Sequence, residues 1–273
     1  MWGAVRALAC LLLPAVTPAS IAHAADLVPT SSPAPNWTVE LGVEIRSLPH
    51  YPGSKVYGEY PMPLFDVRPA GTAPKFHGPR DGFGYSLLDT DTWKAGPVVQ
   101  VDLGRRMSHN PALEGLGNVG ATAEVGGFVD YWPTHWLRAR VELRQGFGGH
   151  TGVVSDQTLD FVLPASAQWT LSGGPRLTEA TRDANAPYFS VNTTQAASSG
   201  LPVYDAGGGV RSYGLGTQAR YQWNPQWASH AFAEYSRLTG SVGQSPIVVQ
   251  RGSADQVMLG IGVTYSFDTR SLW

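Results

Sequence analysis

The sequence predicts an all-β protein, an antiparallel transmembrane β-barrel of about twelve strands within a range of ten to fourteen. Three observations predict it. Apolar and polar residues alternate over many segments, the clearest segments are about ten residues long, and aromatic residues gather near their ends. The composition agrees, since only 15% of residues are charged where about 25% is usual in soluble domains.

The N-terminal residues 1–24 have the pattern of a signal peptide. A short n-region with one positive charge is followed by the apolar stretch Ala7–Val16, and Ala22-His23-Ala24 matches a signal-peptidase site. We expect cleavage after Ala24 and a short periplasmic segment over 25–36. Cys10 raises the alternative of a lipoprotein, but too few residues precede it to form the apolar region of such a leader. It is the only cysteine, so the mature chain is expected to form no disulfide.

The first strand shows the alternation most clearly. In Trp37–Ile45 the odd positions are all apolar, and the even positions are polar, charged or glycine. A strand separates these two sets onto opposite faces, whereas a helix mixes them. The expected barrel spans 37–267 and is followed by a tail, 268–273. Further candidate strands are Trp93–Leu103, Val119–Tyr131, Leu137–Leu143, Trp169–Leu177, Tyr213–Tyr221, Ala231–Tyr235 and Val257–Phe267, with weaker ones at Tyr57–Val67, Phe83–Leu87 and Leu159–Leu163.

Alternation also suits a soluble sandwich or a lipocalin-like barrel. Strand length and the aromatic residues at strand ends favour the membrane barrel, in which the apolar face meets lipid and the polar face lines the lumen. The positions chosen to test the lipid face are Leu103, Val125, Val141 and Ile261, and those for the lumen face are Thr122 and Gln218. Two segments interrupt the pattern: Ala70–Arg80 is predicted to be a Pro/Gly turn, and Glu179–Asp205 a long connection without a helical domain.

Charged residues on the polar faces are the candidate functional residues. In a narrow barrel they would pair across the lumen, and in a wider one they would line a channel; pairing is the preferred interpretation because an unpaired buried charge is unfavourable. The putative lumen charges are Glu40, Glu44, Asp102, Arg106, Glu124, Arg138, Arg140, Glu142, Arg144, Arg220 and Glu234.

The sequence gives little support for an enzyme. His150, Ser155 and Asp156 could be imagined as a hydrolase site, but no nucleophile motif accompanies them, and we expect them to mark a turn made by Gly148 and Gly149. The seven histidines show no metal-ligand spacing. No catalytic, cofactor-binding or metal-binding residue is therefore predicted. The net charge of −2 argues against a nucleic-acid partner.

From Pro49–Ser54 onward the chain resembles the MipA/OmpV family of outer-membrane proteins, the MltA-interacting protein family. The resemblance covers about 220 residues in the family's order. It is carried by Pro61, Pro63, Gly104–Ser108, Leu113–Gly117, Arg144–Gly152, Tyr188–Val191, Ser199–Tyr204, Arg237–Gly240, Ser245–Val248 and Gly262–Phe267.

The resemblance implies an outer-membrane scaffold of a Gram-negative bacterium. The founding member is regarded as binding a lytic transglycosylase and a murein synthase, so that murein cleavage and synthesis are linked. A small-solute channel, or a barrel for adhesion or stress response, is the alternative. Outer-membrane lipid and, through the ending Gly262-x-x-Tyr265-x-Phe267, the barrel-assembly machinery are further expected partners. This chain departs from the family where it has no acidic residue in Thr239–Gln244.

Overall fold

The structure is a computed structural model that describes residues 36–270. The predicted signal peptide, nearly all of the segment 25–36 and the last three residues of the tail lie outside this range. The strands are β1 Trp37–Pro49, β2 Tyr57–Pro69, β3 Phe83–Gly84, β4 Leu88–Asp89, β5 Trp93–Asp102, β6 Thr122–Thr134, β7 Leu137–Gly148, β8 Val153–Pro164, β9 Trp169–Ala180, β10 Gly209–Gln222, β11 Trp227–Leu238 and β12 Asp255–Thr269.

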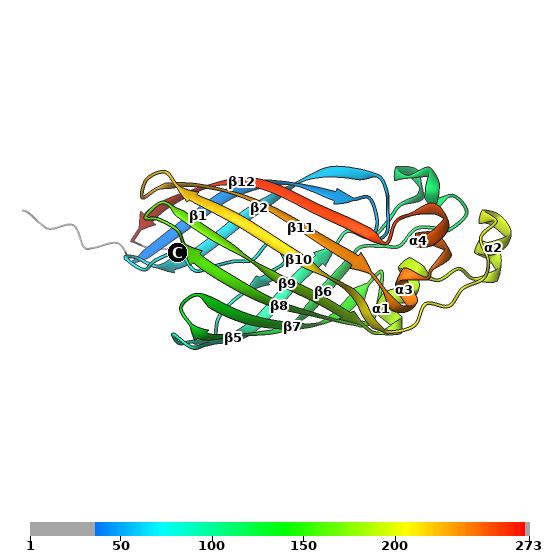
Figure 1. Cartoon of the computed structure of the whole chain (residues 1–273), viewed down its shortest axis with the longest axis horizontal. Coiled ribbons are helices and arrows are strands. Elements are labelled where there is room, and N and C mark those ends of the chain that lie inside the picture. The colour runs from blue at the N-terminus through cyan, green and yellow to red at the C-terminus, as the bar shows by residue number, and fades with distance from the viewer. Residues whose placement is uncertain (1–35, 271–273) are drawn as a thin grey trace, which may run out of the picture. The chain divides into compact units, whose positions relative to one another are not determined.

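The strands form one twelve-stranded antiparallel sheet in which sequence neighbours pair from β5 to β12. The strand β12 also pairs with β1, over the register Trp37↔Thr269 to Ser47↔Leu259, so the first and last strands meet. The order is β2-β1-β12-β11-β10-β9-β8-β7-β6-β5-β3, and β4 also pairs with β5. Figure 1 shows the sheet curled about one axis. The predicted antiparallel barrel of about twelve strands is confirmed.

The two faces of the sheet separate apolar from polar residues. Across β1 and β12, Leu41 faces Tyr265, Val43 faces Val263, and these side chains are exposed on the outer surface. The four predicted lipid-facing positions behave alike: Leu103, Val125, Val141 and Ile261 are exposed by 65, 45, 48 and 64%. Large apolar side chains on an outward face are what a barrel presents to hydrocarbon.

Each candidate strand of the sequence is present, with ends that differ. The weak candidate Leu159–Leu163 is the middle of β8, which begins at Val153. Its outward positions Ser155 and Gln157 are polar, and this hides the alternation in that half of the strand. Of the candidate Phe83–Leu87 only Phe83 and Gly84 form a strand, β3, and the short strand β4 begins directly after the candidate. The strand β12 continues to Thr269, so the first residues of the expected tail belong to the sheet.

Short helices gather at one end of the sheet, here called the cap end (Figure 1). The connection from β9 to β10, expected to lack helices, contains α1 Arg182–Phe189 and α2 Thr193–Ser199. The connection from β11 to β12 contains α3 Gly240–Gly243 and α4 Pro246–Arg251, and 3-10 helices η1 Met107–His109 and η2 Pro111–Leu113 follow β5. None of the helices in residues 36–270 is long and apolar enough to cross a bilayer.

The cap has its own apolar core. One cluster contains Tyr188 and Phe189 of α1 with Val242 and Val248, and a second contains Tyr51 and Ile247 with residues of the connection after β5. All of these side chains are at most 2% exposed. The connections at this end therefore pack against one another in two apolar clusters.

The opposite end, here called the turn end, carries short turns and a belt of aromatic side chains. Three stacked or tilted pairs join neighbouring strands: Trp93–Tyr131, Trp169–Tyr221 and Trp227–Tyr265, with ring centroids 4.4, 4.8 and 4.9 Å apart. Aromatic girdles of this kind lie at membrane interfaces. The belt therefore marks the interface at the turn end.

Candidate functional site: the charged lumen

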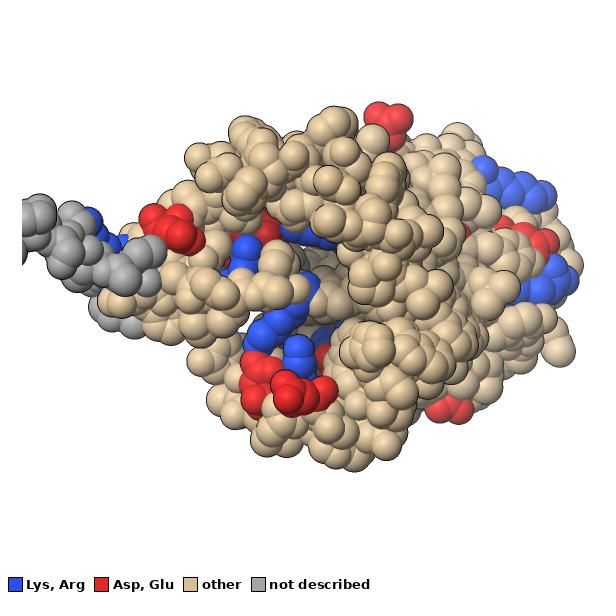
Figure 2. All heavy atoms as spheres, turned by 60° about the vertical axis from the view of Figure 1, so that its left-hand side comes forward, with Lys and Arg blue, Asp and Glu red and all other residues tan. Residues whose placement is uncertain are grey.

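A cavity of about 2130 Å³ occupies the inside of the sheet. Residues of β1 to β3 and β5 to β12 line it, together with residues 71–82. Figure 2 brings the turn end forward and shows a hollow in which basic and acidic side chains lie together. The charged lumen is therefore the candidate functional site.

Arg138 of β7 is the centre of the largest charge network. Its guanidinium lies 2.7 Å from Asp81 and 2.7 Å from Asp160, and the arginine is 1% exposed. The neighbouring inward residue, Arg140, lies 2.9 Å from Asp130 and 2.7 Å from Glu142. Inward residues two apart on one strand point the same way, which is why β7 presents a row of arginines to the lumen.

Arg144 continues this row toward the cap end. It forms an ion pair with Glu124 at 2.8 Å and also contacts Glu142 and Asp156. The other oxygen of Glu124 lies 3.0 Å from Nε2 of His150. On the neighbouring strand β9, Arg176 lies 2.6 Å from Asp160 of β8. Each of these buried arginines has at least one carboxylate partner, which offsets the loss of its hydration.

Residues 70–82 between β2 and β3, here called the inner segment, run into the lumen. Arg80 contacts Glu234 of β11 and donates to Thr178 of β9 at 2.8 Å. The backbone N–H of Gly82 donates to Glu142 at 3.1 Å, and the ring of Phe76 lies 4.6 Å below the guanidinium of Arg138. The prediction that this segment is only a Pro/Gly turn is therefore wrong, because the segment crosses the barrel and is anchored to its far wall.

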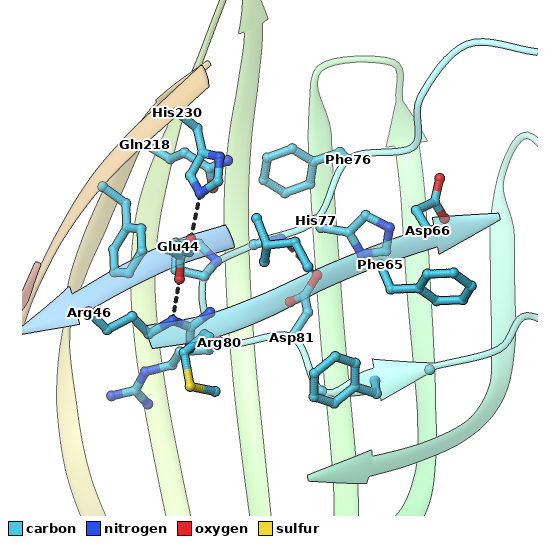
Figure 3. Close-up of a pocket in the computed structure, with 18 of the residues that line it drawn as sticks. Glu44, Arg46, Phe65, Asp66, Phe76, His77, Arg80, Asp81, Gln218 and His230 are labelled. Atoms are coloured by element: carbon cyan, nitrogen blue, oxygen red, sulfur yellow. Dashed lines mark hydrogen bonds and ion pairs between the residues drawn. The ribbon is translucent and has the colours of Figure 1, made fainter. Parts of the chain in front are cut away.

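A second group of charges lies on the wall formed by β1, β2 and β12. Glu40 is 3.3 Å from both Arg68 and Arg220, and it accepts from Ser266 at 2.9 Å. Nearby, Glu44 lies between Arg46 and His230 and contacts both (Figure 3). The two groups connect β1 with strands on both sides of it.

Most of the eleven predicted lumen charges lie in these networks. Arg106 does not: it is exposed, because Gly104 with φ of 73° turns the chain after β5 and interrupts the alternation. The buried arginine there is Arg105, which donates to the carbonyl of Tyr188 at 2.6 Å. Asp102 is only half-buried and accepts from Gly104 N–H at 2.7 Å.

The sequence reasoning missed several members of the networks. The alternation along each strand places four of them on the inward face: Asp130, Asp156, Asp160 and Arg176. Two of these four lie in β8, whose alternation is weak. No local signal identifies the residues of the inner segment, because their role depends on partners 57 to 154 positions away.

The imagined hydrolase residues do not converge. His150 lies in the turn between β7 and β8, as expected, but Ser155 and Asp156 lie within β8 rather than in that turn. Consecutive residues of a strand point to opposite faces, so the hydroxyl and the carboxylate stand on different sides of the wall. Asp156 instead pairs with Arg144, and Ser155 accepts from Gln157 at 2.6 Å. Among residues 36–270 no group of three or more acidic, histidine or cysteine side chains is placed to hold a metal ion.

A family model described as MltA-interacting protein MipA matches residues 41–267. The chain belongs to the MipA family. Within it, the outer membrane protein Omp26La of Vibrio anguillarum is 38% identical over 85 residues, a stretch that spans 31% of each chain. The fold described above and this family assign the chain as an outer-membrane β-barrel.

This MipA-family barrel is also similar to solved porins and channels. The NanC porin is 12% identical with a TM-score of 0.39, over 84% of this chain and 98% of that one. An outer-membrane channel of Pseudomonas putida F1 is 11% identical with a TM-score of 0.40, over 87% of this chain and 97% of that one. Likeness at this level carries no information about what the lumen of this barrel binds.

Proposed function

We propose that this MipA-family barrel is a scaffold of the outer membrane and not a free-diffusion pore or an enzyme. The observation that carries the proposal is the inner segment. Arg80 and Asp81 fix it to β7, β9 and β11 inside the lumen, where it obstructs the path a solute would take. At the far end the connections of the cap pack together in two apolar clusters, which supports the proposal. A barrel whose lumen is obstructed in this way offers its rims for binding.

The turn end is the proposed docking rim for periplasmic partners. In outer-membrane barrels the short turns face the periplasm and the longer connections face outward. The described chain begins and ends at this rim, where Asn36 N–H donates to Thr269 at 3.1 Å. The family description names an interaction with MltA, so a lytic transglycosylase is the proposed partner, with a murein synthase as the second member of the complex.

Affinity capture tests the scaffold. The protein is recovered from chemically crosslinked cells, and the expected result is a lytic transglycosylase or a murein synthase among the captured proteins. An unrelated outer-membrane barrel with the same affinity tag is the control. Recovery of only assembly factors and lipid contradicts the proposal.

The cavity volume favours a second function, a small-solute channel. A space of about 2130 Å³ exceeds the roughly 300–1,000 Å³ of ordinary ligand pockets. Purified protein in planar bilayers distinguishes the two functions. The scaffold predicts no steady conductance, whereas the channel predicts ohmic steps whose size changes when Arg140 or Arg220 is substituted.

A further inference from the structure

The sheet is not closed along one line, here called the seam, between β2 on one side and β3 with β4 on the other. Within residues 36–270, β2 pairs with β1 only, and β3 and β4 pair with β5 only. Residues from both sides of the seam, such as Phe65 and Phe83, line the same cavity as Glu44 and His230. The lumen therefore extends through the wall at this place.

Two prolines keep β2 from closing the seam. The pairing of β1 with β2 is continuous through Ile45↔Pro61 and Val43↔Pro63. Proline has no N–H, so an unbroken ladder requires both proline nitrogens to point away from β1, toward the seam. The free edge of β2 consequently lacks two of its hydrogen-bond donors. Neither β3 and β4 nor a strand of a second copy could form a complete ladder with it.

The seam opens onto the hydrocarbon part of the bilayer. The outward side chains beside it are apolar and among the most exposed of the barrel: Phe65 is 65% exposed and Leu87 76%. Free backbone groups at membrane depth are tolerated only when protein or a water-filled cavity receives them. Here the cavity supplies the water, so the seam joins a hydrated lumen to an apolar surface.

The inside of the seam carries apolar side chains as well, beside the carboxylate of Asp66. The inward residues Met62 and Leu64 of β2 line the cavity, together with Phe76 of the inner segment, which Figure 3 shows near His77. Beyond them the wall is polar. Gln218 Oε1 and Arg68 Nε are buried and have no hydrogen-bond partner among the described residues. An apolar entrance thus leads to a polar interior with a free acceptor and a free donor.

We propose that the seam is a lateral binding site for a phospholipid of the outer membrane. An acyl chain lies between β2 and β3–β4 against Phe65, Met62 and Leu64, and the polar head lies in the hydrated cavity. An amphiphile fits because its two parts match the two environments, and because it needs no strand ladder at the edge that the prolines block. This property is separate from the binding of periplasmic partners at the turn end.

Spin labelling tests the proposal. Cys10 lies in the predicted signal peptide, so the mature chain offers no competing thiol, and a nitroxide is attached in turn to the variants Leu64→Cys, Gln218→Cys and Leu215→Cys. Leu64 and Gln218 are matched inward positions, on the seam and on the closed wall, and Leu215 faces outward. The protein is placed in vesicles of phosphatidylethanolamine and phosphatidylglycerol. For each nitroxide we measure the ratio of its accessibility to oxygen, which enters hydrocarbon, and its accessibility to a water-soluble nickel chelate. We expect the ratio at Leu64 to approach that at Leu215 and to exceed that at Gln218 several-fold.

Two outcomes overturn the proposal. A ratio at Leu64 equal to that at Gln218 means that only water fills the seam, and dipolar broadening between Leu64 labels of two molecules means that a second copy covers it. Unmodified protein provides a check that needs no variant. With phosphatidylethanolamine carrying a diazirine on its acyl chain, we expect photo-insertion at Met62 and Leu64; insertion confined to outward residues contradicts the proposal.

Discussion

The carboxylate of Asp81 accepts two hydrogen bonds from the guanidinium of Arg138, at 2.7 and 3.0 Å. The two residues are 57 positions apart, and the contact joins the inner segment to the first residues of β7, near the turn end. Both side chains are almost fully buried. This pair therefore connects the stability of the barrel wall with the position of the segment that obstructs it.

Replacing Arg138 by methionine is expected to destabilise the barrel strongly. Removal of one partner from a buried ion pair costs about 3–5 kcal/mol, since the other charge remains without compensation, and here both Asp81 and Asp160 would be left. Urea unfolding in lipid vesicles measures the change. The control is Arg182→Met, which removes an exposed pair with Asp205 and should leave the midpoint unchanged. Equal effects of the two substitutions would contradict the prediction.

Releasing the inner segment should increase the conductance of the barrel while the strands of its wall stay folded. In the double variant Arg80→Ala/Asp81→Ala the segment loses its contacts with Glu234, Thr178 and Arg138. We expect the wild type to be silent in planar bilayers and the double variant to show frequent openings. The control variant Lys75→Ala alters the same segment at its exposed pair with Asp89. Openings of equal size in the wild type would show that the segment does not obstruct the lumen.

Arginine on the lipid face should be far more harmful than arginine in the lumen. Ile261→Arg or Val141→Arg near the bilayer midplane is expected to cost roughly 2–4 kcal/mol. Gln218→Arg should cost much less, because the cavity can hydrate it. Thr122, the other predicted lumen position, is not a suitable control, because it is 1% exposed and accepts a hydrogen bond from His150 N–H. Unfolding midpoints and heat-modifiable migration in detergent measure the difference; similar losses at Gln218 and Ile261 would contradict it.

Tyr51 makes the cap sensitive to alkaline pH. Burial raises the pKa of its hydroxyl above the ordinary value of 10, and the hydroxyl has no hydrogen-bond partner among the described residues. The neutral form is thus favoured in the folded cap. The associated stability is fully present below pH 10 and is lost as the pH rises through the higher folded-state pKa.

Tyr51→Phe tests this pH dependence. The substitution removes a buried hydroxyl without a partner, so at neutral pH stability should be unchanged or slightly increased. Above pH 10 the variant should lose less stability than the wild type. Chemical unfolding at a series of pH values, followed by tryptophan fluorescence, gives both comparisons. A steeper alkaline loss in the variant would contradict the role of Tyr51.

The sequence by itself determined the class of fold and the identity of most strands. The alternation of apolar and polar residues indicates which face of a strand meets lipid. Trp37–Ile45 and Val257–Phe267 could therefore be recognised as strands without knowledge of the strands that they pair with. The same phase gave Arg138, Arg140, Glu142 and Arg144 as inward charges. Such information is local, because strand geometry alone sends adjacent residues to opposite faces.

Only the tertiary structure decided how the lumen is filled and where the wall is open. Residues 70–82 were predicted to be a turn because proline and glycine indicate only the local backbone conformation. Nothing in the segment indicates that it contacts the distant residues Arg138 and Glu234. The seam likewise depends on contacts between distant segments. Pro61 and Pro63 show that one edge of β2 lacks donors, but which edge that is depends on the pairing with β1. Contacts between segments far apart in the chain are set by the closing of the sheet, and a local pattern does not encode them.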